Sequence, residues 1–254
     1  MELVNLPLRF RNGARVTESS AVLSFDLAEA TQYLAERDEH LRHLIEETTP
    51  FQLKIETAQS PYETLVEAVT YQSISGKAAA TIFGRVKALS STGRAPSPQE
   101  MLKLRKPVLR KAGLSGAKIL AMKDLAKKTI DGVVPTLEQA QSLSDEELVD
   151  RLVSVRGIGA WTVEMFLIFS LGRPDVLPIH DLGVKKGWAI TYGKKYMPKP
   201  KELLAFGERW RPYRTVASWY MWRACQRAGN ATMRKIRPAE VRKRKPTKPK
   251  HPRR

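Results

Sequence analysis

The sequence has little cysteine, no long apolar run and a shortage of acidic residues. Its 254 residues include one cysteine, Cys225, which excludes an internal disulfide framework, a cysteine-rich zinc site and a four-cysteine iron–sulfur cluster. No stretch approaches the roughly 18–20 apolar residues that cross a membrane. No basic-then-apolar leader with a small-residue cleavage site opens the chain. We therefore expect neither a transmembrane protein nor one with a secretion signal.

Basic residues dominate the charge: 44 Lys and Arg against 26 Asp and Glu give +18 at pH 7. Residues 234–254 hold eleven Lys and Arg, one Glu and four Pro, a composition that predicts a disordered tail. Such a tail either contacts nucleic acid, acts as a nuclear import signal or only aids solubility. We expect a nuclear location if the source is eukaryotic and a cytoplasmic one otherwise. The rest of the chain is also basic, which favours an anionic partner.

Apolar residues recur with helical spacing, and convincing alternating strands are absent, so the predicted class is mainly α. We expect residues 1–25 to form a flexible arm, 26–233 a helical body and 234–254 the basic tail. Capping residues and glycines set the helix bounds. The predicted helices cover 26 to about 48, the segment from Pro61, 77–89, 107–112, 118–130, 144 to about 155, 160–171, 182–192, 201–210 and 214–227.

The most informative stretch is Leu152-Val-Ser-Val-Arg-Gly-Ile-Gly-Ala-Trp-Thr-Val-Glu-Met165. A helix ends near Val155, a turn carries Gly157 and Gly159, and a new helix starts at once. The glycines let the backbone turn tightly and approach another molecule. The first N–H groups of the second helix are unpaired and lie at the positive end of its dipole, which suits a phosphate oxygen. Taken alone, the same pattern also fits a plain helix–helix turn.

Gly157-Ile-Gly159 followed by an apolar helix resembles the helix-hairpin-helix of the DNA glycosylase superfamily that contains endonuclease III. Other segments resemble the DNA-3-methyladenine glycosylase II family, which removes alkylated bases. These segments occur in the family's order within about residues 60–228: Tyr71-Gln-Ser-Ile-Ser75, Arg110-Lys-Ala-Gly-Leu-Ser-Gly-Ala-Lys118, and Arg209-Trp-Arg-Pro-Tyr-Arg214 with Trp222 behind it. The resemblance implies a two-lobed helical fold without an N-terminal β domain. The hairpin at about 152–166 would share one lobe with the middle helices, and DNA would lie in a cleft between the lobes.

In that superfamily an aspartate follows the hairpin after one helix and a short loop, and Asp181 stands at the matching place. An aspartate before an apolar helix is also a common N-cap, and both roles are compatible because the helix dipole favours an ionised carboxylate. The resemblance makes Asp181 the catalytic residue. Its carboxylate would stabilise positive charge on the deoxyribose as the base departs, or orient or deprotonate the attacking water.

Trp161 stands where bifunctional members of the superfamily carry a lysine that attacks the sugar. Because tryptophan cannot supply that nucleophile, we expect a monofunctional enzyme that leaves an abasic site in an uncut strand. The resemblance also places Trp161, Met165 and Trp222 at the base pocket. Aromatic faces attract a cationic alkylated purine, although the same tryptophans fit a hydrophobic core equally well.

A base within a duplex must be flipped out before it can react. In the family, a side chain from the loop matching residues 71–75 fills the gap in the stack. Here we expect Gln72 or Ser75 to face the DNA and Ile74 to face the core. Phosphate contacts are expected from Gly157, Gly159 and Arg156, although the Arg156 side chain also fits a solvated surface position.

The family hairpin commonly binds a monovalent cation, Na⁺ or K⁺, through main-chain carbonyls, which here would be those of Val153, Val155 and Ile158. No catalytic cofactor is expected, and the four histidines are scattered. His40 and His43 share a helical face that we expect at the surface, whereas His180, next to Asp181, is a weaker candidate for a DNA contact.

The sequence therefore predicts a monomeric, monofunctional DNA glycosylase that acts on double-stranded DNA. It would hydrolyse the N-glycosidic bond of alkylated purines of the 3-methyladenine and 7-methylguanine type, the first step of base excision repair. Two alternatives are a non-catalytic helix-hairpin-helix DNA-binding protein and a glycosylase for another damaged or mismatched base. No membrane partner is expected.

Overall fold

The computed structural model describes residues 23, 25–48, 51, 53, 55, 59–229, 232 and 236–238. Most of the predicted N-terminal arm and basic tail therefore lies outside the described residues. Within them the chain is helical, and its β-structure is confined to an isolated bridge between Tyr196 and Arg237. In the same residues, no helix is both long and apolar enough to span a bilayer.

The helices are α1 (Leu27–Arg37), α2 (Glu39–Glu47), α3 (Pro61–Tyr71), α4 (Gly76–Lys87), α5 (Pro98–Lys103), α6 (Lys106–Lys111), α7 (Gly116–Ile130), α8 (Leu137–Ser142), α9 (Asp145–Val153), α10 (Ala160–Phe169), α11 (Leu182–Thr191), α12 (Pro200–Gly207) and α13 (Arg214–Arg227). A 3-10 turn at Glu208–Trp210 follows α12, so the predicted helix 201–210 changes its winding before its end. The mainly helical fold class is confirmed.

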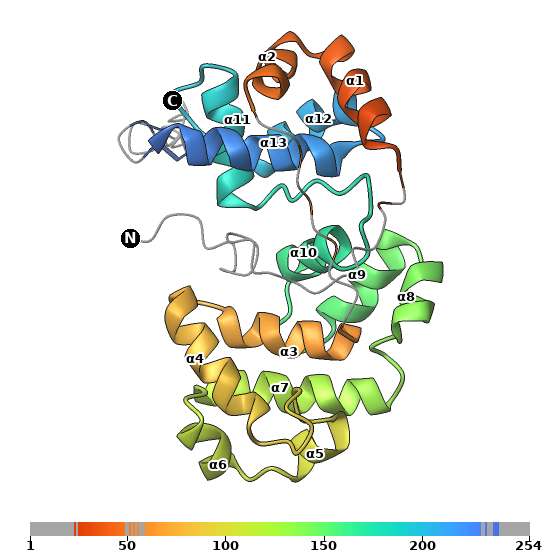
Figure 1. Cartoon of the computed structure of the whole chain (residues 1–254), viewed down its shortest axis with the longest axis vertical. Coiled ribbons are helices and arrows are strands. Elements are labelled where there is room, and N and C mark those ends of the chain that lie inside the picture. Colours follow the sequence, from red (N-terminus) through yellow and green to blue (C-terminus); the bar gives the residue numbers. More distant parts are fainter. Residues whose placement is uncertain are drawn as a thin grey trace, which may run out of the picture.

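The helices form two lobes (Figure 1). In one lobe, α7 packs against α3, α5 and α6, while α10 packs against α3 and α9. In the other, the N-terminal helices α1 and α2 lie against α13, and α11 packs along both α13 and α2. The first and last parts of the chain thus combine into one lobe, and α10 lies on the side of the other lobe that faces it (Figure 1).

Short polar sequences set the helix starts. Ser144 accepts a hydrogen bond from the Glu147 N–H, and the Glu147 carboxylate accepts one from the Ser144 N–H, which confirms the predicted capping box of α9. Equivalent boxes begin α5 and α8, two six-residue helices that the apolar periodicity did not predict. Both are too short for a periodic pattern to stand out.

The prediction of one helix from Asp26 to about Thr48 is wrong, because the chain breaks at Asp38 and forms α1 and α2. Asp38 has an extended backbone, and its carboxylate accepts from the Leu41 N–H at 3.1 Å as the N-cap of α2. The same carboxylate accepts from the Tyr192 hydroxyl at 2.5 Å and the Trp210 indole at 3.5 Å. These distant partners hold α2 against the C-terminal helices.

Helices α11 and α13 approach closely at Gly187. A Cβ on this residue would lie 1.9 Å from the carbonyl oxygen of Met221, so only glycine permits the contact. This contact sets α11 tightly along α13, so that the residue before α11 lies beside the middle of α13.

Candidate active site

The carboxylate of Asp181 receives three N–H donors. Asp181 is the N-cap of α11, and its Oδ1 accepts from the Val184 N–H and from Nε1 of Trp222, each at 2.8 Å. Its Oδ2 accepts from Nε1 of Trp161 at 2.8 Å. The donors stabilise the negative charge and fix the orientation of the carboxylate. Since Trp161 lies in the first turn of α10 and Trp222 lies on α13, the two lobes meet at this carboxylate.

The tryptophans at the carboxylate differ in exposure. Trp222 is 2% exposed, and its ring stacks on Phe169 with centroids 5.7 Å apart. Met165 is also buried, whereas Trp161 is half-buried. Trp161 is therefore the aromatic residue of the predicted pocket that retains accessible surface, while Trp222 presents its N–H edge to Asp181. Contact of these side chains with a base stays a prediction.

A second carboxyl group lies close to Asp181 and was missed in the sequence. Glu164 is the one charged residue of α10, and its Oε2 is buried without a hydrogen-bond partner in the described structure. Burial raises the pKa of Glu164 to about 7, and the charge of Asp181 adds to the effect. The available signal was a single acid within an otherwise uncharged helix, Ala-Trp-Thr-Val-Glu-Met-Phe-Leu-Ile-Phe.

The turn between α9 and α10 needs a glycine at one position and leaves space at another. Gly157 has φ +77°, in the left-handed region that favours glycine, and a Cβ there would lie 3.2 Å from Cβ of Ala121. Gly159 has an extended backbone, and an added Cβ would meet nothing within 4 Å. No side chain caps the start of α10. The open surface at an uncapped helix start fits the predicted phosphate contact.

Helix α7 supports this turn through two side chains that sequence reasoning missed. The Arg156 N–H donates to Oδ2 of Asp124 at 2.7 Å, and this bond is one reason why the pKa of Asp124 lies below its usual value. Nζ of Lys128 lies 3.0 Å from the same carboxylate and donates to the carbonyl of Ser154. The Arg156 side chain remains exposed, so it is available to an anion.

The loop between α3 and α4 lies against the hairpin. Nε2 of Gln72 donates to the carbonyl of Gly157 at 2.9 Å, and the Ser75 hydroxyl caps α4 by accepting from the Ala78 N–H at 3.5 Å. Ser73 is exposed and has φ +58°, an uncommon conformation for a residue other than glycine. Ile74 is half-buried and is not among the apolar residues that pack against the core, contrary to the expectation that it faces inward. Insertion of Gln72 or Ser75 into DNA stays a prediction.

The hairpin carbonyls fit the predicted monovalent cation. Among the described residues, the carbonyls of Val153 and Ile158 accept no hydrogen bond outside a helix, and that of Val155 accepts one from Ile158, leaving a lone pair free. Neutral oxygen donors of this kind suit Na⁺ or K⁺. Elsewhere, within the described part of the chain, no group of three or more His, Cys, Asp or Glu side chains could hold a metal ion.

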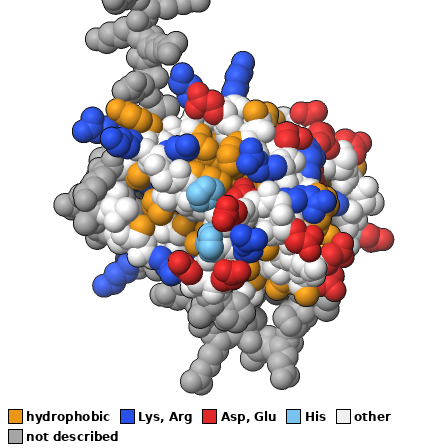
Figure 2. Space-filling view, turned by 90° about the horizontal axis from the view of Figure 1, so that it is seen from above, with side chains coloured by type: hydrophobic (Ala, Val, Ile, Leu, Met, Phe, Trp, Pro, Cys, Tyr) orange, Lys and Arg blue, Asp and Glu red, His pale blue; other side chains and the backbone are white. Residues whose placement is uncertain are grey.

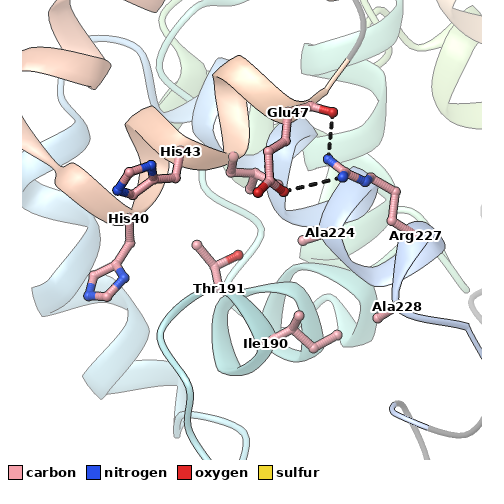
Figure 3. A pocket seen from close by; sticks show the side chains of 9 residues that line it. His40, His43, Glu47, Ile190, Thr191, Ala224, Arg227 and Ala228 are labelled. Atoms are coloured by element: carbon pink, nitrogen blue, oxygen red, sulfur yellow. Dashed lines mark hydrogen bonds and ion pairs between the residues drawn. The ribbon is translucent and has the colours of Figure 1, made fainter.

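A cavity of about 370 Å³ lies away from these residues. It opens between α2 and the C-terminal ends of α11 and α13, and Figure 3 shows His40, His43 and Thr191 around it, with Arg227 bonded to Glu47 at its rim. Seen from above, histidine side chains lie next to an apolar hollow on this face (Figure 2). Asp181 precedes the opposite end of α11, so the cavity is separate from the candidate active site. The surface positions predicted for His40 and His43 are confirmed, and His180 is exposed.

Comparison with known proteins identifies the family. The profile of the HhH-GPD superfamily of base excision DNA repair proteins matches residues 66–212, which include the hairpin and Asp181. The chain belongs to this superfamily. It therefore belongs to the base excision DNA repair proteins that the two glycines and the aspartate first suggested.

Two named relatives come from Schizosaccharomyces pombe. DNA-3-methyladenine glycosylase 1 is 42% identical over 170 residues, which cover 67% of this chain and 75% of that protein. The alkylbase DNA glycosidase-like protein mag2 is 28% identical over 78% of this chain and 93% of its own length.

Solved structures agree with this assignment. The S. pombe 3-methyladenine DNA glycosylase in complex with abasic DNA is 38% identical, with a TM-score of 0.69, over 77% of this chain and 95% of that one. The DNA-3-methyladenine glycosidase of Bacillus halodurans is 32% identical, with a TM-score of 0.70, over 80% and 91% of the two chains. The predicted resemblance is confirmed.

Proposed function

We propose that this protein is a monofunctional DNA glycosylase that hydrolyses the N-glycosidic bond of alkylated purines in duplex DNA. The observation that carries the proposal is the Asp181 carboxylate, held by three N–H donors directly after the hairpin of a superfamily of base excision repair proteins. The names of the relatives support alkylated bases as substrates.

Asp181 acts on the sugar of the extruded nucleotide. The bond between C1′ and the purine nitrogen breaks, its electron pair stays with the base, and positive charge develops on the deoxyribose. The Asp181 carboxylate stabilises that charge because its donors hold it in place before the reaction begins. A water oxygen then bonds to C1′ and releases a proton to the carboxylate or to solvent. The products are the free base and an abasic site.

Trp161 supports hydrolysis rather than strand cleavage. Its indole nitrogen donates a hydrogen bond to Oδ2 of Asp181, and the indole has no nucleophilic lone pair to attack C1′. The amine that would form a Schiff base with the sugar is absent from this position. Its half-buried ring offers a surface on which a cationic purine can stack.

The hairpin holds the DNA backbone near the carboxylate. The uncapped start of α10 and the open surface at Gly159 accept a phosphate, and the exposed Arg156 adds a positive charge. A monovalent cation on the carbonyls of Val153, Val155 and Ile158 would add positive charge to the same turn. Gln72 or Ser75, on the loop bound to the hairpin, would fill the gap left by the flipped base.

The substitution Asp181→Asn tests the proposal, because it removes the negative charge with little change of shape. We expect base release from a duplex containing one 7-methylguanine to fall by roughly 10²–10⁴-fold, while binding to that duplex is retained. The exposed Asp150 of α9 provides the matched control, and Asp150→Asn should keep normal activity. Asp181→Asn with near-normal base release would refute the assignment. Absence of release by the unmodified protein from every damaged duplex would favour a non-catalytic DNA-binding role.

Borohydride trapping tests the monofunctional mechanism. Incubation of the protein with damaged duplex and borohydride should give no covalent protein–DNA complex, because no Schiff base forms during hydrolysis. A bifunctional glycosylase assayed in parallel serves as the positive control. A trapped complex that depends on the lesion would contradict a hydrolytic mechanism.

A further inference from the structure

Glu164 is a half-buried acid that hydrolysis at Asp181 does not use. It lies in a helix whose other residues are uncharged, and its Oε2 is shielded from solvent without a hydrogen-bond partner in the described structure. An unsatisfied buried polar oxygen is costly, and native proteins usually provide a partner for it. A ligand that brings an N–H group to this oxygen would remove that cost.

Helical geometry and electrostatics place Glu164 near the predicted base pocket. Glu164 follows Trp161 by three residues, so the two side chains share one side of α10 about one helical turn apart. Trp161 contacts the Asp181 carboxylate, and the charge of Asp181 acts on Glu164. A purine joined to a sugar that faces Asp181 would enter beside these residues. In that arrangement the base would lie on the side of Glu164 and the sugar on the side of Asp181.

We propose that Glu164 is the residue of this active site that selects cationic bases. Its carboxyl oxygen accepts a hydrogen bond from an N–H of the extruded purine, and its negative charge pairs with the positive charge of the alkylated ring. The pairing is stronger in a site shielded from water than in bulk solvent. A neutral base gains no charge pairing, so it binds less tightly. This inference rests on the proposed function.

The proton on Glu164 makes this selection depend on pH. Burial and the charge of Asp181 raise the pKa of Glu164 to about 7, so much of the free protein carries a neutral Glu164 near neutral pH. A cationic base favours the ionised form, and the proton leaves to solvent on binding. Affinity for a cationic lesion should therefore rise as pH increases through about 7 and fall below it.

Of the charged groups around Glu164, Asp181 is the one whose charge raises the pKa of Glu164. Helices α3 and α9 pack against α10, and there Glu63 pairs with Arg94 while Asp145 pairs with Arg173. Lys186 of α11 and Asp181, which precedes α11, act through their charges on the buried thiol of Cys225 of α13. Any pH dependence that Glu164→Gln abolishes is therefore distinct from the titration of these groups.

Selection through binding has a kinetic signature. During bond cleavage the positive charge moves from the base to the sugar, so Glu164 interacts more strongly with the bound substrate than with the transition state. Removing such an interaction weakens substrate binding without slowing the chemical step. A catalytic acid would behave differently, because its loss lowers the maximal rate.

The test measures single-turnover release of 7-methylguanine as a function of enzyme concentration, with Glu164→Gln compared with the unmodified protein. We expect the half-saturating concentration of Glu164→Gln to rise by about tenfold to a hundredfold, the usual effect of losing a hydrogen bond to a charged group. The maximal rate should not fall, because the lost interaction is stronger in the bound substrate than in the transition state. Between about pH 6 and about pH 8, the pH dependence of half-saturation should disappear in the variant.

Control measurements separate this role from a structural one. Glu138→Gln makes the same chemical change at an exposed position of α8 and should leave all parameters unchanged. Glu164→Asp keeps the charge and should restore part of the affinity. Competition by duplexes with hypoxanthine or with no lesion should be the same for Glu164→Gln and the unmodified protein. Thermal unfolding of each variant verifies the fold.

The outcomes distinguish failure of the inference about Glu164 from failure of the proposed function. An unchanged half-saturating concentration in folded Glu164→Gln, a lower maximal rate, or an equal loss of affinity for every duplex would overturn the role of Glu164 and leave the glycosylase function intact. If the unmodified protein releases no base at all, the proposed function itself fails.

Discussion

At the residue scale, the two indole donors distinguish Asp181 from an ordinary helix cap. The Val184 N–H alone would make Asp181 a normal N-cap, whereas Trp161 and Trp222 add N–H donors from outside its own helix. Each added bond restricts the direction in which the carboxylate points. The free energy that holds the charge in place is thus supplied by folding before DNA arrives.

Replacement of Trp161 by phenylalanine tests this contribution. Trp161→Phe keeps an aromatic ring but removes the donor to Oδ2, so base release should fall by about tenfold to a hundredfold. Single-turnover release of 7-methylguanine measures the effect. Trp188→Phe is the matched control, because the indole N–H of Trp188 is buried without a partner in the described structure. Full activity in Trp161→Phe would show that its hydrogen bond has no role in catalysis.

Sequence reasoning identified Asp181 but not Glu164, for a physical reason. Asp181 has a local signal, an acid before an apolar helix at the family's distance from the hairpin. The role of Glu164 depends on burial and on a charge from another helix, neither of which can be read from its neighbours in the chain. Gln72 illustrates the same limit, since its partner is the carbonyl of Gly157, far away in the sequence.

At the element scale, the predicted helix bounds lie close to the observed ones where a capping residue or a glycine sets the helix end. The predicted helix 214–227 matches α13, and the capping box of Ser144 begins α9 as expected. The break between α1 and α2 could not be predicted, because Asp38 is held by Tyr192 and Trp210 from the end of the chain. Tertiary contacts overrode a sequence that otherwise continues with helical spacing.

The contact between α11 and α13 permits a stability test. Gly187→Ala would place a Cβ 1.9 Å from the Met221 carbonyl and should reduce the free energy of unfolding by about 1–3 kcal/mol. Thermal unfolding should show a fall of about 2–4 °C in Tm for each kcal/mol. Gly84→Ala, in α4 with nothing within 4 Å, should instead raise stability by about 0.5–1 kcal/mol. Equal Tm changes for the two variants would contradict the close packing.

At the scale of the whole molecule, the charge of +18 predicts binding to DNA that depends strongly on salt. Residues 239–254 carry eight Lys and Arg, so a chain that ends at Pro238 tests their contribution. We expect the logarithm of affinity to fall less steeply with the logarithm of salt concentration, by about 0.9 for each phosphate that the shortened chain no longer neutralises. The maximal rate of base release should remain unchanged. Superimposable salt dependences would exclude a DNA contact by this segment.

The bond between Trp161 and Asp181 joins a donor from one lobe to an acceptor from the other. If the lobes separate slightly, the carboxylate keeps Val184 and Trp222 but loses its third donor. Gentle warming should then inactivate the protein before its helices melt. A ligand that contacts both lobes should protect the activity against such warming, because it opposes their separation.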